Sequence, residues 1–113
     1  MEKIVVETLL FDFYGELLTD HQKAVYEAVV MNDYSCTEIA QEQGISRQGV
    51  HDMIKRCRRI LEDYESKLHL VSQFLETKAK VEEIHCLAEE FKKSGNMSDI
   101  DRIEQISAEI CEL

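Results

Sequence analysis

The sequence predicts an all-α protein, because three of its features are typical of helical chains. Apolar residues recur at steps of three and four along almost the whole chain, which places them on single helix faces. The 113 residues include no proline and only four glycines, so helix breakers are rare. No stretch longer than residues 68–75 lacks a charged side chain, so we expect no membrane insertion. We therefore expect five or six helices in a single domain over residues 1–113.

The composition indicates a globular protein of the cytoplasm. Hydrophobic residues make up 44% and charged residues 32% of the chain, which is a folded rather than a disordered balance. The first residues, M-E-K-I-V-V-E, contain an acid and no long apolar stretch, so no secretory signal is expected. Cys36, Cys57, Cys86 and Cys111 show no CxxC spacing, and in a chain of the cytoplasm we expect them to be buried or idle thiols rather than a disulfide frame.

The N-terminal third of the chain predicts two helices. Apolar residues at helical spacing run from residue 6 to residue 18, and Gly15 should end or bend this first helix. Thr19 or Asp20 can cap the second helix. Asn32-Asp33 should close it, because both residue types favour turns over helix interiors.

Residues 35–61 are the most informative part of the chain and predict a helix-turn-helix. Ser35 opens an S-x-x-E capping box, so a short helix should follow it. Two short helices that cross steeply need a small residue, a residue that tolerates positive φ, and apolar anchors. These roles are assigned to Ala40, Gly44, Ile45 and Val50. Ser46 is then expected to cap a second helix that extends to Leu61.

Residues 62–113 predict a C-terminal helical extension. An apolar three–four alternation runs from residue 54 to residue 75, which permits one long helix or two with a joint near residues 63–66. After a break at residues 94–96, Ser98 with Asp101 should cap a last helix. The extension has more apolar positions than a short three-helix unit can cover, which predicts a homodimer. The alternative is that the last helix folds back and covers them within one chain.

The charge distribution separates residues 35–61 from the rest. The whole chain has a net charge of −10, which opposes sequence-blind binding to nucleic acid. Residues 35–61 nevertheless carry a net charge of +2, whereas the segments on either side are acidic. This basic island indicates contact with a local anion or an internal acidic–basic interface, and charge alone does not decide between them.

The predicted helix 46–61 contains the candidate binding residues. Its N-terminal turns expose residue types that read base edges or phosphates, namely Ser46, Arg47, Gln48, His51 and Asp52. The turns that follow contain basic residues suited to phosphate contacts, namely Lys55, Arg56, Arg58 and Arg59. The alternative is a solvated face, or pairing with the acids of residues 62–65.

The sequence gives no indication of a metal site, a cofactor or an enzyme. His85 and Cys86 are adjacent, so on a helix they point about 100° apart, whereas zinc needs three or four converging ligands. No thiol is matched with a base and an orienting group, and no glycine-rich phosphate loop is present.

Residues 18–61 resemble region 4 of bacterial sigma factors, in which such a unit reads promoter DNA in the major groove. They begin L-T-D-H-Q-K and contain C-T-E-I-A-Q-E-Q-G-I-S-R-Q-G-V-H-D-M-I. With F-D-F-Y-G-E-L-L-T before the unit and L-E-D-Y-E-S-K-L after it, the whole chain resembles the YlxM family. That family comprises small bacterial helix-turn-helix proteins linked to the signal recognition particle pathway.

Three functions follow from these observations. The first is a nucleic-acid-binding regulator, with DNA or the RNA of the signal recognition particle as the ligand. The second is an accessory module that binds a protein of the pathway, such as the particle's GTPase, through its acidic helices. The third is a sigma-like transcription factor, which ranks last because the chain outside the basic island is acidic.

Overall fold

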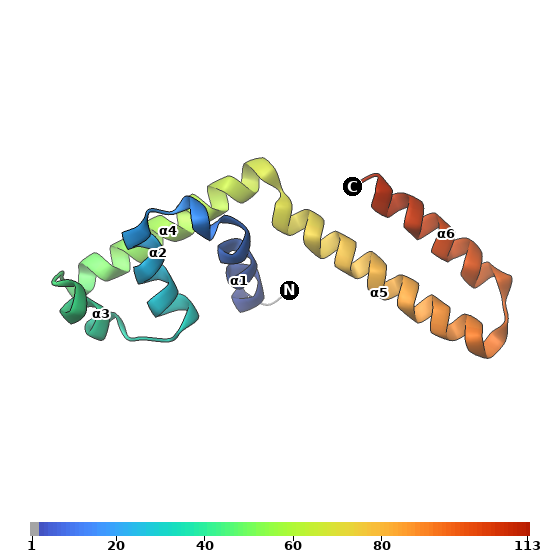
Figure 1. Cartoon of the computed structure of the whole chain (residues 1–113), viewed down its shortest axis with the longest axis horizontal. Coiled ribbons are helices and arrows are strands. Elements are labelled where there is room, and N and C mark those ends of the chain that lie inside the picture. The colour runs from blue at the N-terminus through green and yellow to red at the C-terminus, as the bar shows by residue number, and fades with distance from the viewer. Residues whose placement is uncertain (1–2) are drawn as a thin grey trace. The chain divides into compact units, whose positions relative to one another are not determined.

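The computed structural model describes residues 3–113, and this part of the chain is helical with no strand (Figure 1). The predicted all-α fold is confirmed. The elements, in order, are α1 (Lys3–Tyr14), the 3-10 turn η1 (Gly15–Leu17), α2 (Asp20–Tyr26), the π-helical turn η2 (Glu27–Met31), α3 (Cys36–Gln43), α4 (Arg47–Leu68), α5 (Leu70–Ser94) and α6 (Met97–Cys111).

The chain divides into two compact units. The first ends at Val71, and the second comprises Ser72–Leu113. The helix-turn-helix therefore lies wholly within the first unit, and the hairpin formed by most of α5 with α6 makes up the second.

The first two helices begin and end close to the expected residues. Gly15 follows α1 directly and opens η1. A complete capping box begins α2: the Thr19 hydroxyl accepts from the Gln22 N–H at 3.2 Å, and the Gln22 side chain accepts from the Thr19 N–H at 3.0 Å. The chain leaves η2 through Asp33, which has a φ of 60°.

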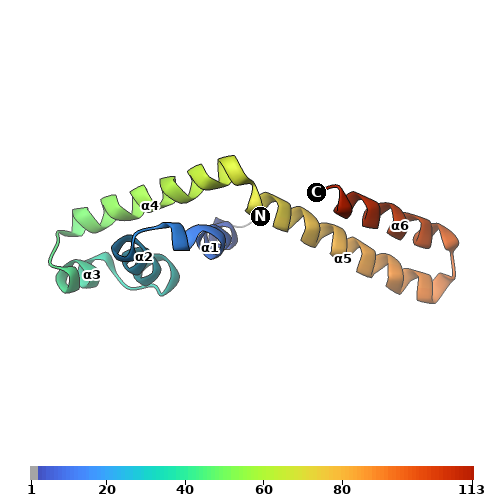
Figure 2. The same cartoon turned by 45° about the horizontal axis from the view of Figure 1, so that its top comes forward.

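The core of the first unit lies between α4 and the three helices that precede it. Figure 2 shows α1, α2 and α3 along one side of α4. The apolar spacing of residues 46–61 predicts an inward face of Val50, Met53, Ile54, Cys57 and Leu61, and Met53 is only half-buried. The face that α4 turns toward the preceding helices consists of Val50, Ile54, Cys57 and Leu61, all of which are buried. The largest fully buried side chains of the partner helices are Tyr14, Val25 and Tyr26.

The continuous apolar pattern after residue 54 is divided between two helices. The break falls at His69, which adopts a left-handed conformation with a φ of 58° and ends α4. It lies a few residues later than the joint considered near residues 63–66. No glycine or proline marks the break, so local sequence gave no signal for its position.

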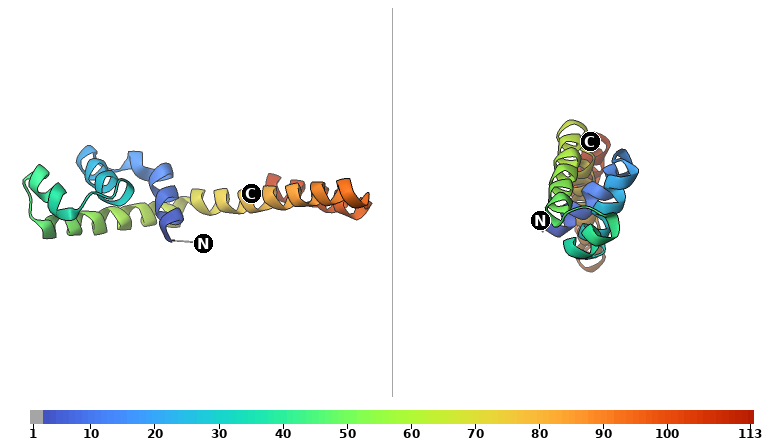
Figure 3. Two further views of the ribbon diagram at one scale, coloured as in Figure 1. Left: turned by 90° about the horizontal axis from the view of Figure 1, so that it is seen from below. Right: turned by 90° about the vertical axis from the view of Figure 1, so that its left-hand side faces the viewer.

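The second unit is an antiparallel helical hairpin (Figures 1 and 3). The predicted cap of its second helix is wrong. Asn96, and not Ser98, caps α6, because the Asn96 side chain accepts from the Ser98 N–H at 3.1 Å and the helix already begins at Met97. Gly95, with a φ of 67°, turns the chain immediately before this cap.

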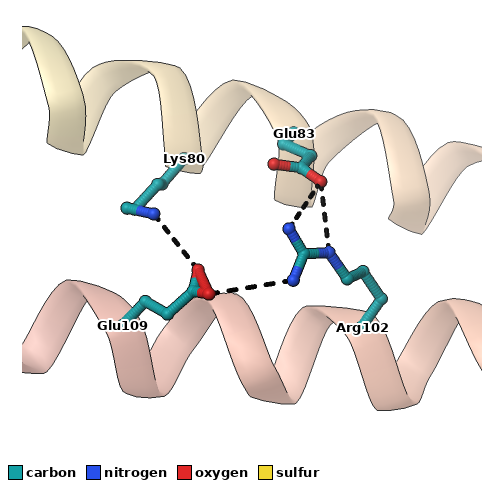
Figure 4. A network of polar contacts seen from close by, with 4 residues as sticks. All are labelled: Lys80, Glu83, Arg102 and Glu109. Carbon is teal, nitrogen blue, oxygen red and sulfur yellow. Dashed lines mark hydrogen bonds and ion pairs between the residues drawn. The ribbon is translucent and has the colours of Figure 1, made fainter.

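Ion pairs connect the two helices of this hairpin (Figure 4). Lys80 Nζ lies 3.1 Å from Glu109 Oε2, and Arg102 bridges Glu83 at 3.3 Å and Glu109 at 3.8 Å. The last helix thus folds back on the one before it. It does not cover all the apolar side chains, because Val81 remains 51% exposed.

Candidate nucleic-acid interface

The turn between α3 and α4 has the geometry that its residues predict. The Ala40 carbonyl accepts from the Gly44 N–H, and it also accepts from the Ile45 N–H at 3.1 Å. Gly44 has a φ of 69°, in the left-handed region that favours glycine. Ala40 and Val50 are buried and Ile45 is half-buried. All four predicted turn residues therefore lie at the crossing of the two helices.

Serine side chains cap both helices of the unit. The Ser46 hydroxyl accepts from the Gly49 N–H at 2.9 Å, and the Ser35 hydroxyl accepts from the Glu38 N–H at 3.1 Å. The box at α3 differs from expectation, because the Glu38 carboxylate accepts from the Ser35 hydroxyl rather than from its backbone N–H. A hydroxyl can donate and accept at once, and donation to a carboxylate is a strong hydrogen bond.

Gly49 is a structural residue that the sequence analysis missed. A Cβ atom at this position would lie 3.1 Å from the Ser46 hydroxyl oxygen, which is tighter than ordinary van der Waals contact. The absence of a side chain thus leaves room for the cap of α4. The S-x-x-G spacing at residues 46–49 was the available signal.

The exposed face of α4 brings most of the predicted binding residues together. Its side chains are exposed, unlike Val50, Ile54, Cys57 and Leu61 on the same helix, and His51 and Lys55 lie at its edge toward α1 and η2. Its members share helical spacing and solvent exposure. They are Ser46, Arg47, Gln48, His51, Asp52, Lys55, Arg56 and Arg59, here called the α4 face.

Two polar contacts order side chains near the start of the α4 face. Gln48 Nε2 donates to Asp52 Oδ1 at 3.0 Å. His51 Nδ1 lies 3.9 Å from Cys36 Sγ at the beginning of α3. The first contact holds the Gln48 amide along the helix, and the second brings the His51 imidazole close to α3.

The basic side chains of the α4 face are available for an external anion. Within residues 3–113, no side-chain ion pair or hydrogen bond engages Arg47, Lys55, Arg56 or Arg59. For these four residues, pairing with the protein's own acids is not observed. Four unpaired cations on one exposed helix face can contact the phosphates of a nucleic acid.

Arg58 does not join this group. Its Nε atom lies 3.3 Å from Oε1 of Glu7 on α1, and the Glu7 side chain is only 17% exposed. The helix turns by about 100° between residues 58 and 59, which moves Arg58 to the edge of the buried face. Of the two uses considered for the basic island, internal neutralisation applies to Arg58.

Tyr26 lies within the electrostatic field of this pair. Burial raises the pKa of the Tyr26 hydroxyl, the Glu7 carboxylate raises it further, and the Arg58 guanidinium acts in the opposite direction. The sequence did not indicate Glu7 as a partner of the basic island, because Glu7 on α1 and Arg58 on α4 are far apart in the chain.

Neither a metal site nor a membrane-spanning helix is found in residues 3–113. These residues contain no cluster of three or more His, Cys, Asp or Glu side chains that could hold a metal ion. None of their helices combines the length and apolar character that crossing a membrane requires.

Comparison with known proteins gives one family across nearly the whole chain. Residues 1–103 match the family model of helix-turn-helix proteins described as YlxM / p13 like. A UPF0122 protein of Streptococcus gordonii is 44% identical over 99 residues, covering 88% of this chain and 87% of the relative. One from Thermoanaerobacter sp. is 44% identical over 107 residues, covering 94% and 92%. One from Caldanaerobacter subterraneus is 52% identical over 77 residues, covering 68% and 66%.

Proposed function

Because the chain belongs to the YlxM / p13-like family of helix-turn-helix proteins, we propose that it is a nucleic-acid-binding regulatory protein. The observation that carries the proposal is the α4 face, where four basic side chains that have no ion-pair partner within residues 3–113 follow a serine-capped helix start. Helix-turn-helix proteins use this part of the second helix to contact base edges.

The ligand that this geometry favours is double-stranded DNA. The major groove of B-form DNA is about 12 Å wide and admits an α-helix, whereas the major groove of A-form RNA is deep and narrow. In this arrangement Arg47 and Gln48 meet base edges, and Lys55, Arg56 and Arg59 contact phosphates. The signal recognition particle pathway is the process that the family resemblance suggests for this regulation.

The acidic charge of the chain limits binding that is independent of sequence. A net charge of −10 repels a polyanion at long range, so affinity depends on the few contacts of the α4 face. Each neutralised phosphate contributes about −0.9 to the slope of log affinity against log salt. Three phosphate contacts thus give an expected slope of about −3.

We also propose that the chain acts as a homodimer through its C-terminal hairpin. The support is the exposure of apolar side chains there, 51% for Val81 and 60% for Met97. A hairpin of two helices buries little apolar surface, and a second copy would cover these side chains. Sedimentation velocity at micromolar concentration should give twice the 13.1 kDa mass of one chain. A single species of 13.1 kDa would exclude the dimer.

A salt titration of binding tests the proposed function. Fluorescence anisotropy should be measured with three labelled probes: a pool of random DNA duplexes, an RNA duplex, and the RNA of the signal recognition particle. The salt concentration is varied about fourfold, from about 50 to 200 mM, so that the slope can be determined. We expect the DNA slope given above and weaker binding of the RNA duplex. Tighter binding of the particle's RNA would instead identify RNA as the ligand.

The accessory-module alternative predicts a different result from the same apparatus. A protein of the signal recognition particle pathway bound through apolar contacts would show a shallow salt dependence, because few counterions are released. No DNA or RNA binding at low salt, together with salt-insensitive binding to the particle's GTPase, would overturn the nucleic-acid proposal in favour of this one.

A further inference from the structure

An open surface cavity of about 620 Å³ lies on the first unit, on the side of α4 that faces α1 and η2. Its apolar lining comes from three elements, with Ile4 on α1, Val29 and Val30 on η2, and Ile54 on α4. Its volume falls in the range of sites for small molecules, roughly 300–1,000 Å³. Space and apolar surface for a small organic body are therefore present.

The charged side chains around this cavity favour an anion. Glu7 and Arg58 both line it and neutralise each other across 3.3 Å. Lys3 and Lys55 also line it, and within residues 3–113 neither is engaged by a carboxylate. The remaining acid is Asp33, so the two lysines outnumber it. An apolar body with one anionic group matches this arrangement.

Two unusual backbone features border the same cavity. The turn that supplies Val29 and Val30 is π-helical, a conformation that is rare and frequent at functional sites. Asp33, which follows it, has a φ of 60° without being glycine, at a cost in free energy. Both features shape the wall formed by residues 29–33, and neither is needed for the turn between α3 and α4.

We propose that this cavity binds a small organic anion, with its apolar body against Ile4, Val29, Val30 and Ile54 and its anionic group between Lys3 and Lys55. The ligand class is an alkyl or aryl carboxylate, sulfonate or phosphate ester. Binding itself does not depend on the proposed nucleic-acid function.

A regulatory consequence follows, and it does rest on the proposed function. Lys55 and His51 belong both to the cavity lining and to the α4 face. An anion paired with Lys55 removes one of the cations that would contact phosphate, so the ligand weakens nucleic-acid binding. By linkage, nucleic acid weakens ligand binding by the same factor. The bound anion would thus act as an inducer that releases the protein from its nucleic acid.

Octanoate is a suitable probe, because it combines a carboxylate with an apolar chain. The full-length protein, labelled at isoleucine, leucine and valine methyl groups, is titrated and followed by NMR. The methyl signals of Ile4, Val29, Val30 and Ile54 should shift together along one saturable curve. The methyl signals of Val81 and Ile100, on the hairpin, should shift little. Octylammonium, with the same chain and the opposite charge, should bind at least tenfold more weakly.

Two variants localise the site. Charge reversal in K3E/K55E should weaken octanoate binding by about tenfold, because it replaces two exposed ion contacts, each of modest strength, by repulsion. The control K67E/K78E makes the same change in net charge at exposed lysines that do not line the cavity, and it should bind like the parent. In V30W the larger indole side chain occupies part of the cavity next to Val29 and Ile54, and octanoate binding should weaken while the circular dichroism spectrum stays helical.

The proposal is overturned if the four cavity methyl groups do not shift, if octylammonium binds as well as octanoate, or if K67E/K78E weakens binding as much as K3E/K55E. The charge-reversal pair keeps the test decisive should V30W not fold. DNA binding is measured on the same samples by anisotropy. Octanoate binding without any DNA binding would reject the proposed function and retain the ligand site.

Discussion

The Tyr14 hydroxyl donates a hydrogen bond of 2.6 Å to Glu65 Oε1, which joins the last residue of α1 to the last turn of α4. The same hydroxyl accepts from the Leu70 N–H at 3.1 Å, and the same carboxylate oxygen accepts from the Val71 N–H at 2.9 Å. Two side chains therefore satisfy N–H groups of the first turn of α5, which has no intrahelical acceptors for them.

Replacement of Tyr14 by phenylalanine should lower the free energy of unfolding by about 1.5–3 kcal/mol, because it removes a hydrogen bond to a charged group. It also deprives the Leu70 N–H of its acceptor. Urea denaturation measures the change. Tyr64→Phe is the matched control: its ring lies 6.1 Å from that of Tyr14, and its hydroxyl makes no hydrogen bond within residues 3–113. An equal loss in both variants would contradict the role of the hydroxyl.

The same hydrogen bond makes stability sensitive to alkaline pH. Burial raises the pKa of Tyr14, and the hydrogen bond to Glu65 raises it further. Because the pKa is higher in the folded state, this contribution to stability is fully present below the ordinary tyrosine pKa of about 10. It is lost as the pH rises above that value. The free energy of unfolding should be measured by denaturation between about pH 8 and 11, which extends two units below and one unit above that pKa. It should fall less over this range for Tyr14→Phe than for the parent protein.

The features that the sequence predicts correctly are those fixed by neighbouring residues. Ser35, Gly44 and Ser46 act on backbone groups within a few positions of themselves, so their spacing alone indicates the helix-turn-helix. The inward face of α4 follows from its three–four spacing in the same way. Helix class, the turn and the exposed α4 face are therefore all available from local patterns.

Contacts between distant residues could not be predicted. Glu65 follows Tyr14, and Arg58 follows Glu7, by the same long separation in sequence, and each pair forms only after α1 has packed on α4. From the sequence, Arg58 was therefore predicted to contact phosphate like the basic residues next to it, Lys55, Arg56 and Arg59. The break at His69 falls a few residues after the joint considered near residues 63–66, because the apolar spacing continues through it without a helix-breaking residue.

Replacement of Gly44 by valine should destabilise the protein by about 1–3 kcal/mol. The space around Gly44 is open, with no atom within 4 Å of an added Cβ, so the cost comes from its φ of 69° alone. Gly44→Asn should cost less, because asparagine tolerates the left-handed region. Thermal unfolding followed by circular dichroism measures both. Equal melting temperatures for valine and glycine would contradict this assignment.

The four cysteines should differ in their reaction with a thiol reagent. Cys86 and Cys111 are exposed and should react quickly, and the half-buried Cys36 more slowly. Cys57 is buried, and burial raises its pKa, so its thiolate is both inaccessible and scarce. It should react only when the protein unfolds, which a titration with and without denaturant will show. Rapid reaction of all four in the native protein would contradict the packing of α4 in the core.

The basic residues of α4 should separate into two groups by their effects. Lys55→Ala and Arg59→Ala each remove an exposed cation that no acid within residues 3–113 engages, so each should reduce the salt slope of DNA binding by about one unit and leave the melting temperature unchanged. Arg58→Ala should do the opposite. It leaves the largely buried Glu7 carboxylate without its ion pair, which should cost about 1–3 kcal/mol of stability, while the salt slope stays the same. If both Lys55→Ala and Arg59→Ala bind DNA like the parent protein, with the same salt slope, the α4 face is rejected as the surface that contacts DNA.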